Sequence, residues 1–498
     1  MLGIIKSTLK NTVIYSIGTF SSKLIGLILI PLYTSKFDTA QYGMLGIMEI
    51  SSQVLVALMG FGLFNAYFRW YWDPKYIQKQ KSLLFTIIVF LLFQFLLFFI
   101  LVFSIRSELS YLLFESKDHA YLVGLLFCFS AFEAFGVVIS TLLRLREKAG
   151  FYTVIQVTKL IVSLFFTIYL IKYRGEGIEA VYESLLIANI VTFVLIINLL
   201  RHSIEIKFEW KILKEMVSFS FPLMLTTLSG IILNITDRYT LRFITDLETV
   251  GIYTLGFKIA NTIRIVVISS VNLALQPVLF RMMDEPGNKR FYSKAFTYFT
   301  FGLMFFVMLF AFFAKEIVQA ISAGDAYLNA YRIIPVLSLS MLFTMFRDVT
   351  YTGLNKMKKT KVIALIIVFA SILNIILNLL FIPLWNYQGA AFATTLSQII
   401  FFIIMYVFAQ KYYFIPYELK KILMMILTGA GLFIFSRFSD ILPLLYRIPL
   451  KLGLILTFPF ILYFLGFYEE KEIEYIKRIW KKWHNPLEWV NNLKKINQ

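Results

Sequence analysis

The chain is poor in the residues that many enzymes and metal proteins use. Cys128 is its only cysteine, so it can form no internal disulfide and no cysteine-based metal site. The three histidines, His119, His202 and His484, all fall at or beyond the ends of apolar segments. We therefore expect no buried histidine chemistry. No glycine-rich phosphate loop ending in Gly-Lys-Ser or Gly-Lys-Thr is present, which argues against direct use of ATP.

Charged residues are also scarce, at 15% of the 498 residues, whereas 59% are hydrophobic. Soluble domains contain about 25% charged residues. Apolar segments that approach the length of about 20 residues needed to cross a bilayer recur about fourteen times. Because backbone polar groups in lipid must bond internally, we predict an all-α integral membrane protein with about fourteen transmembrane helices. The expected spans are 12–33, 42–64, 82–104, 120–143, 151–171, 179–200, 213–236, 249–273, 292–313, 328–352, 361–381, 388–409, 418–437 and 445–467.

Basic residues alternate between crowded and sparse loops along the chain. One set of loops, with both termini, holds 31 lysines and arginines, and the opposite set holds 11. The positive-inside rule places the crowded side in the cytoplasm. We therefore expect cytoplasmic N- and C-termini, a retained first span, and a location in a bacterial or archaeal cytoplasmic membrane. The net charge of +19 then indicates topology anchors that face anionic membrane lipid, and no nucleic-acid partner.

The last thirty residues differ in pattern from the spans. From Glu469 onward, Ile473, Ile476, Trp480 and Trp483 share one helical face, while lysines and an arginine fill the other side. This pattern is typical of an amphipathic helix lying on the inner leaflet. A peptide-binding role is the alternative.

The two halves of the chain share short motifs in the same order. Residues 33–37 (Tyr-Thr-Ser-Lys-Phe) resemble residues 239–243 (Tyr-Thr-Leu-Arg-Phe), and a glycine opens the next span in each half, at Gly43 and Gly251. The alternative is chance matching of short motifs. Such a parallel repeat predicts two six-helix lobes related by an axis along the membrane normal. The expected divisions are an N-terminal lobe at 1–208, a C-terminal lobe at 209–411, helices 13 and 14 at 412–468 and a cytoplasmic tail at 469–498.

Polar and ionisable residues inside the spans are candidate functional residues, because charge is costly in a bilayer and usually faces a bundle interior or a watery cavity. The candidates for substrate binding are Lys23, Lys258, Asn261, Arg264 and Arg347. The candidates for ion coupling or for lining the cavity are Glu49, Gln53, Glu133, Lys159, Asp237 and Asp348.

Two interpretations of these residues remain open. In the structural one, Lys23–Glu49 and Arg347–Asp348 are buried pairs that fix helix packing. In the functional one, several cations converge on a cavity between the lobes and bind an anion. The cations outnumber the carboxylates, and an uncompensated charge in lipid is unfavourable unless water or a substrate compensates it. A phosphate or carboxylate ligand suits that surplus, because arginine can bind it in bidentate fashion.

Several segments resemble the polysaccharide transporter branch of the multidrug, oligosaccharidyl-lipid and polysaccharide exporter superfamily. These segments are residues 11–15, 26–34 and 41–43 in the first half and Gly389–Thr394 in the second. The resemblance implies a MATE-like fold, with two parallel six-helix lobes in a V and two further C-terminal helices. It also implies a flippase for polyprenyl-pyrophosphate-linked oligosaccharides, with lipid-linked glycan as the substrate and polysaccharide polymerase and glycosyltransferases as partners.

Relatives in that branch place cations on helices 1, 2 and 8. Lys23 and Arg264 fit helices 1 and 8, whereas Glu49 stands on helix 2 where a cation is expected. By the same resemblance, the last two spans, with Gly429 and Gly431, form a groove for the polyprenyl tail.

The expected mechanism is alternating access without a bound cofactor and without enzymatic chemistry. The candidate coupling ion is H+ or Na+, carried by Glu49, Glu133 or Asp237. Three alternatives stay open: a lipid II flippase, an ion-coupled drug exporter of the same fold, and a membrane-embedded polysaccharide polymerase or ligase. A non-transporting scaffold leaves the intramembrane charges unexplained.

Overall fold

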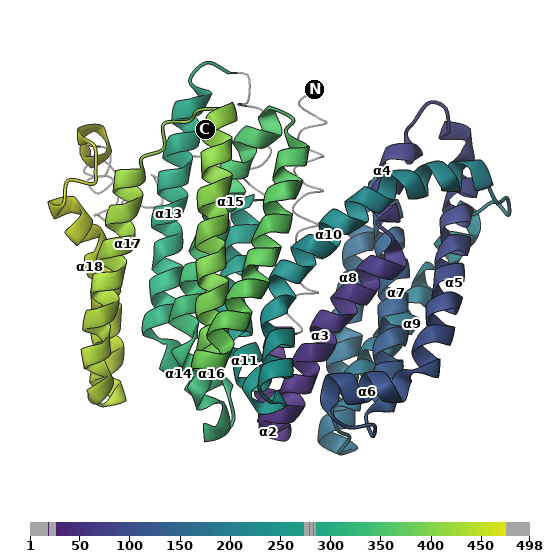
Figure 1. Ribbon diagram of the computed structural model, residues 1–498, viewed down its shortest axis with the longest axis horizontal. Helices are drawn as coiled ribbons and strands as arrows, with labels where there is room; N and C mark the ends of the chain where they lie inside the picture. Colours follow the sequence, from purple (N-terminus) through teal and green to yellow (C-terminus); the bar gives the residue numbers. More distant parts are fainter. Residues whose placement is uncertain (1–17, 19–25, 273–277, 279–281, 283–284, 475–498) are drawn as a thin grey trace, which may run out of the picture. The chain divides into compact units, whose positions relative to one another are not determined.

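The chain is helical throughout the part that the computed structural model describes, residues 18, 26–272, 278, 282 and 285–474, which contains no β-strand (Figure 1). The α-helices of the first half are α2 (Ile30–Lys36), α3 (Thr39–Gly60), α4 (Leu63–Tyr71), α5 (Gln80–Ser104), α6 (Arg106–Phe114), α7 (Ala120–Leu145), α8 (Ala149–Ile168) and α9 (Glu179–Ser203). Those of the second half are α10 (Trp210–Ile244), α11 (Leu247–Ile263), α13 (Asn288–Phe312), α14 (Ala314–Ile321), α15 (Ile334–Lys356), α16 (Thr360–Tyr412), α17 (Leu419–Phe438) and α18 (Leu444–Phe464). Short 3-10 or π-helical segments are η1 (Ile77–Lys79), η2 (Tyr169–Tyr173), η3 (Arg264–Ile268), η5 (Asp325–Arg332) and η6 (Ser439–Ile441).

The described residues hold 11 helices long and apolar enough to cross a membrane, or up to 12 when the bent pair η5 and α15 counts as one span. The all-helical membrane fold is thus confirmed. The 53-residue helix α16 covers two expected spans, 361–381 and 388–409, and has a non-helical backbone at Asn386 between them. The expected span 12–33 falls mostly outside the described residues. The count of fourteen therefore stays a prediction.

The chain divides into two compact units. Unit 1 comprises Met1–Gln276 and Ala314–Phe414, and unit 2 comprises Pro277–Phe313 and Ile415–Gln498. Unit 1 contains helices from both halves of the sequence repeat, and unit 2 contains α13, α17 and α18. The division into lobes at residues 208 and 411 is a separate proposal, which rests on the repeat.

Within unit 1, helix α3 of the first half packs against helix α11 of the second half (Figure 1). Both helices begin in the same way, because an aspartate caps each one. The Asp38 carboxylate accepts a hydrogen bond from the Gln41 backbone N–H at 2.7 Å, and the Asp246 carboxylate accepts one from the Thr249 N–H at 2.7 Å. Such caps satisfy backbone donors that the first turn of a helix leaves free. The sequence repeat therefore recurs in local geometry.

The two glycines of the repeat meet where α3 and α11 cross. A Cβ atom on Gly43 would overlap the carbonyl oxygen of Leu247, and a Cβ atom on Gly251 would overlap the carbonyl oxygen of Thr39. Each glycine therefore faces the backbone one turn before the other glycine. Small residues let membrane helices approach this closely. The contact is symmetric, and it needs glycine at both positions.

Two further contacts join the halves near the same end of α3 and α11. The Tyr327 hydroxyl of η5 donates to the carbonyl oxygens of Phe37 and Asp38, at 2.9 and 2.8 Å. Arg242, at the end of α10, donates to the carbonyl oxygen of Leu113 at 2.6 Å and pairs with Glu115 at 2.7 Å. Backbone atoms of the first half are thus held by side chains of the second.

In unit 2, an ion-pair cluster joins α13 to the segments next to α17 and α18. Lys294 pairs with Glu418 at 3.0 Å and Glu472 at 3.3 Å, and also with Glu469. Burial by itself raises the pKa of Glu418, but hydrogen bonds from Thr297, Lys294 and Lys421 outweigh burial and hold the pKa below its ordinary value. Unit 2 is therefore tied together at this end by charge.

Other features expected of this part of the chain are tested only in part. Of the expected amphipathic face of the tail, Ile473 is described, whereas Ile476, Trp480 and Trp483 lie outside the described residues. Gly429 packs against Met304 of α13, and a Cβ at Gly431 would meet open space. A lipid groove on α17 and α18 stays a prediction.

Replacing Gly43 by alanine should destabilise unit 1, because the new Cβ forces α3 away from the Leu247 carbonyl oxygen. Overpacking of this kind costs about 1–3 kcal/mol. We expect a lower midpoint of thermal unfolding in detergent. Gly230→Ala is the matched control, because a Cβ at Gly230 would meet no atom within 4 Å. Equal midpoints for the two variants would contradict the close contact.

Candidate functional site

A cavity of about 570 Å³ lies within unit 1, between the segment that leads into α2, helices α3, α8 and α9, and the continuous stretch of α11 and η3. We name it the cation cavity. Five residues singled out in the sequence line it: Glu49, Gln53, Lys258, Asn261 and Arg264. The rest of the lining is Gly26, Tyr33, Leu45, Thr167, Val181, Tyr182, Leu185, Ile265 and Ser269.

An ion pair between α3 and α11 forms part of this wall. The Nζ atom of Lys258 lies 2.9 Å from the Oε2 atom of Glu49. The lysine side chain is 16% exposed and the glutamate side chain 46%, so the carboxylate is open to the cavity. Lys258 also lies over the ring of Tyr42, 5.4 Å from its centre. Glu49 of α3, which stands where a cation was expected, thus compensates the charge of Lys258.

Arg264 is a cation of this cavity without a carboxylate beside it. Among the described residues, no acidic side chain lies within ion-pair distance of its guanidinium, which donates to the Asn234 Oδ1 atom at 3.4 Å. Arg264 opens the π-helical segment η3, and its carbonyl oxygen accepts a hydrogen bond from the Ser269 hydroxyl at 3.0 Å. π-Helical turns within α-helices are frequent at functional sites. The cavity therefore contains a cation that has no ion-pair partner among the described residues.

Arg347 and Asp348 of α15 form a pair of their own. Two guanidinium nitrogens of Arg347 donate to the Asp348 Oδ1 atom, at 2.7 and 3.0 Å. A third contact reaches Gln398 of α16 at 3.4 Å, and Asn272 lies 3.5 Å from Asp348. The structure thus contains the Arg347–Asp348 pair of the structural interpretation, and neither residue belongs to the lining of the cation cavity.

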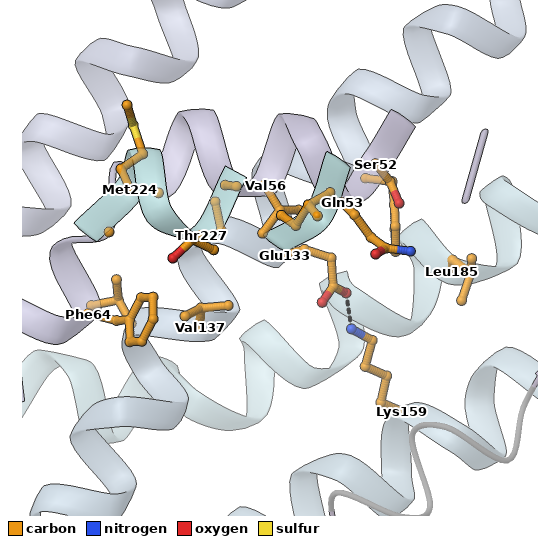
Figure 2. A pocket seen from close by; sticks show the side chains of 17 residues that line it. Ser52, Gln53, Val56, Phe64, Glu133, Val137, Lys159, Leu185, Met224 and Thr227 are labelled. Atoms are coloured by element: carbon orange, nitrogen blue, oxygen red, sulfur yellow. Dashed lines mark hydrogen bonds and ion pairs between the residues drawn. The ribbon is translucent and has the colours of Figure 1, made fainter. Parts of the chain in front are cut away.

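Glu133 of α7 and Lys159 of α8 lie in a second cavity of about 490 Å³, which we name the Glu133 cavity. Figure 2 shows their side chains pointing toward one another, and Lys159 donates to Glu133. Gln53 and Leu185 line both this cavity and the cation cavity. The two cavities are therefore neighbours that share part of their walls.

Asp237 is almost fully enclosed by protein, with 2% of the residue exposed. The Tyr253 hydroxyl donates to its Oδ2 atom, and the backbone N–H of Arg238 donates to its Oδ1 atom at 2.8 Å. The Nε atom of Arg238 lies 3.9 Å from the same carboxylate. Asp237 does not line the cation cavity, so it is a buried charge apart from that cavity.

Sequence reasoning missed two buried amides on α16, Asn374 and Asn378, at 1% and 0% exposure. The Asn378 Nδ2 atom donates to the Asn374 side-chain oxygen at 3.1 Å, and the Asn374 Nδ2 atom donates to the Ser397 hydroxyl at 3.0 Å. Within the part of the chain that the structure describes, the Asn378 Oδ1 atom has no partner. The available signal was the presence of two asparagines one turn apart in an apolar span. They were not predicted as site residues, because the candidates were chosen mainly among ionisable groups.

The structure thus sorts the candidates into groups. Glu49, Gln53, Lys258, Asn261 and Arg264 meet in one cavity, and Glu133 and Lys159 lie in the adjacent one. Arg347, Asp348 and Asp237 line neither. Lys23 lies outside the described residues, so the expected Lys23–Glu49 pair is not tested. The functional roles of all these residues stay predictions.

Comparison with family models gives two matches. The model described as polysaccharide biosynthesis protein matches residues 8–283, which is more than half of the chain. The model described as MatE matches residues 222–380. Together the two matches include helices from both halves of the sequence repeat.

Solved membrane transporters share the fold. The lipid II flippase MurJ, in an inward closed conformation, matches with a TM-score of 0.75 and 18% identity, over 91% of this chain and 99% of that chain. An inward-facing MATE-family multidrug resistance transporter matches with a TM-score of 0.62 and 14% identity, over 80% and 94%. The MATE multidrug transporter DinF-BH matches with a TM-score of 0.61 and 16% identity, over 82% and 95%.

Curated proteins match over shorter stretches. A membrane protein of Methanocaldococcus jannaschii is 24% identical over 312 residues, which are 59% of this chain and 60% of that protein. Protein 1 of the Lsg locus of Haemophilus influenzae is 23% identical over 285 residues, 55% of this chain and 67% of that protein. The chain thus spans about 60% of the length of the archaeal relative that it matches.

The Lys258–Glu49 pair should show energetic coupling. Lys258→Met and Glu49→Gln each leave one charged group without its partner, whereas the double variant removes both charges. Because Glu49 is nearly half exposed, we expect a coupling energy of about 1 kcal/mol. Thermal unfolding of the four proteins in detergent gives this value. Strictly additive losses would contradict the pair.

Proposed function

The chain belongs to the polysaccharide biosynthesis protein family, a polysaccharide transporter branch of the multidrug, oligosaccharidyl-lipid and polysaccharide exporter superfamily, and we propose that it flips a lipid-linked glycan. The substrate is a polyprenyl-pyrophosphate-linked oligosaccharide, such as an O-antigen, capsule or exopolysaccharide repeat unit. It moves from the inner to the outer leaflet of the cytoplasmic membrane. Glycosyltransferases that build the unit and a polymerase that consumes it are the expected partners.

The observation that carries this proposal is the uncompensated charge of Arg264 in the cation cavity. A pyrophosphate group supplies the missing negative charge, and a guanidinium binds phosphate oxygens in bidentate fashion. Asn261 lines the same wall and can add a hydrogen bond. Lys258 contributes a second cation, whose partner Glu49 is open to the cavity. Lys23 is expected to join them from the first expected span. Arg347 is close enough to repel the charge of Arg264, so the Arg347–Asp348 pair adds to the field that the phosphate meets.

Alternating access follows from the way the two halves meet. The distribution of basic residues supports cytoplasmic termini, which places the first turns of α3 and α11 at the outer face of the membrane. The contacts of Gly43, Gly251 and Tyr327 then close the outer end, so the cavity takes its substrate from the cytoplasm. Rocking of the proposed six-helix lobes breaks these contacts and opens the cavity outward, while the polyprenyl tail stays in lipid beside α17 and α18. The substrate shifts the population between the two states.

An ion gradient is the proposed energy source. Asp237 is the most enclosed of the three candidate coupling carboxylates, because Glu133 is 27% exposed at its side chain and Glu49 46%. Binding of H+ or Na+ removes the cost of a buried charge, so occupancy can bias one state over the other. The carboxylate oxygens of Asp237 and the hydroxyl oxygen of Tyr253 suit either ion.

Two other functions are distinguished by their substrates. A lipid II flippase shares this fold, as the MurJ structure shows, and it would prefer a peptide-bearing disaccharide lipid. A drug exporter of the same fold would bind cations, which the charge of Arg264 disfavours. A polymerase or ligase would change covalent bonds, whereas we propose that this protein is not an enzyme and returns its substrate unchanged.

Replacing Arg264 by alanine should lower the flipping rate at least tenfold, because the phosphate loses a charge-assisted contact of about 1.5–3 kcal/mol. Arg264→Lys should keep part of the rate, since the charge stays and the bidentate geometry is lost. The measurement is the transfer of a fluorescent undecaprenyl-pyrophosphate-linked oligosaccharide across proteoliposome membranes.

Arg290→Ala is the control for this prediction, because Arg290 is exposed at the start of α13 and lies outside the cavities. Its rate should equal that of the unmodified protein. An Arg264→Ala protein that folds normally and flips at the full rate would remove the basis of the proposal.

Replacing Asp237 by asparagine should abolish the response of flipping to an imposed gradient of H+ or Na+, because the side chain no longer changes its charge. Flipping without a gradient should persist. The same proteoliposomes, loaded with defined inner buffers, measure both rates. Glu248→Gln, at an exposed acidic residue in the first turn of α11, is the matched control. An unchanged gradient response in Asp237→Asn would exclude this residue as the coupling group.

A further inference from the structure

A third cavity, of about 370 Å³, lies between α7, α8 and α9 in the first half of unit 1. We name it the amide cavity. The flipping mechanism above makes no use of it, although its size falls within the range of about 300–1,000 Å³ that is typical of ligand pockets. Its polar lining includes Glu133, Ser140, Gln156, Lys159, Asn189 and Thr192.

Asn189 indicates that this cavity can bind a ligand and is not simply a packing defect. It is 7% exposed, and its side-chain Nδ2 atom has no hydrogen-bond partner among the described residues. A buried polar group without a partner is unfavourable, because it has lost its bonds to water and gained none in the protein. Because Asn189 lies in the cavity wall, a ligand with a hydrogen-bond acceptor can satisfy this amide.

The amide cavity stands at the end of a series that begins at Arg264. The cation cavity shares Gln53 and Leu185 with the Glu133 cavity. The Glu133 cavity in turn shares Glu133, Val137 and Lys159 with the amide cavity. The three cavities are therefore neighbours in a row, with the ion pair of α7 and α8 at the last boundary.

We infer that the amide cavity receives a neutral sugar residue of the lipid-linked glycan, while the pyrophosphate lies at Arg264. The inference rests on the proposed function and adds the part of the site that recognises the sugar. Sugar hydroxyls donate and accept hydrogen bonds, and the amides of Gln156 and Asn189 offer both donors and acceptors. The Glu133–Lys159 pair is neutral as a whole. Arg144 also lines the cavity, but it is an exposed residue at the end of α7 and donates to the Thr141 hydroxyl at 3.4 Å, so the enclosed part of the wall does not demand a charged ligand.

Other ligands fit this lining less well. A lipid acyl chain would leave the amides of Asn189 and Gln156 without partners, at a cost that apolar contact does not recover. A second phosphate would lie close to the carboxylate of Glu133. The apolar remainder of the wall, with Phe132, Phe135 and Tyr152, suits the less polar faces of a sugar ring.

This arrangement makes the amide cavity a determinant of specificity. A site built to hydrogen-bond a hydroxyl group discriminates strongly against ligands that lack it. A glycan of a single sugar ends near the cation cavity, whereas an oligosaccharide reaches the amide cavity. The amide cavity therefore favours the assembled repeat unit over its unfinished precursors.

The test compares two lipids in proteoliposomes: undecaprenyl pyrophosphate carrying a monosaccharide and the same carrier with an oligosaccharide. Asn189→Leu keeps the approximate shape of the side chain and removes its amide. We expect the oligosaccharide rate to fall about tenfold, the equivalent of one lost hydrogen bond, and the monosaccharide rate to stay unchanged. Asn198→Leu, an exposed amide on the same helix α9, is the matched control and should affect neither lipid.

A second measurement reports occupancy directly, without relying on transport. In a Cys128→Ala background, Ser140→Cys places a single thiol in the wall of the amide cavity. A methanethiosulfonate reagent should label this thiol. The oligosaccharide lipid should protect the thiol, and the monosaccharide lipid should not.

The outcomes separate this inference from the proposed function. If the unmodified protein flips neither lipid, the proposed function fails. If it flips both but Asn189→Leu slows them equally or not at all, and the thiol shows no selective protection, the amide cavity is a water-filled space and the inference fails.

Discussion

The constraint on which this structure depends is that a charge within a bilayer needs a partner. Lys258 has Glu49, Lys159 has Glu133 and Arg347 has Asp348. Each of these pairs also joins or stiffens helices, so compensation of charge and packing are achieved together. Among the described cations of the cation cavity, Arg264 departs from the pattern, because no described carboxylate lies within ion-pair distance of it. Water or a bound anion can supply the missing partner. The proposed anion site thus depends on Arg264, the cation that has no carboxylate partner among the described residues.

Much of the fold could be predicted because its signals are local. Apolar length identifies spans, and the spacing of basic residues orients them, without knowledge of any contact between helices. The repeat was also visible, and the glycines that it singled out, Gly43 and Gly251, proved to be the closest approach of α3 and α11. The polar residues of the expected span 249–273 likewise included Lys258, Asn261 and Arg264 of α11 and η3, because residues on one helical face share one environment.

The sequence could not show which residues contact each other across helices. The pair of Glu49 with Lys258 was not predicted, because it is made by the crossing of two helices far apart in the sequence. The expected pair of Glu49 with Lys23 is not tested, since Lys23 lies outside the described residues. The break between the expected spans 361–381 and 388–409 does occur, at the non-helical backbone of Asn386, although its exact position has no hydropathy signature. The amides of Asn189, Asn374 and Asn378 were not predicted for another reason. Even where a signal exists, as in the spacing of Asn374 and Asn378, the role of an uncharged polar residue in a span depends on what surrounds it.

The crossing of α3 and α11 has a consequence for the origin of the molecule. Each helix presents the same glycine to the backbone of the other, so the contact is isologous: the same patch appears on both sides, related by a local two-fold rotation. A surface of this kind is complementary to itself. Two unlinked copies of a six-helix ancestor could therefore have paired through it as a homodimer. Fusion of such copies into one chain preserves the contact and frees each half to diverge.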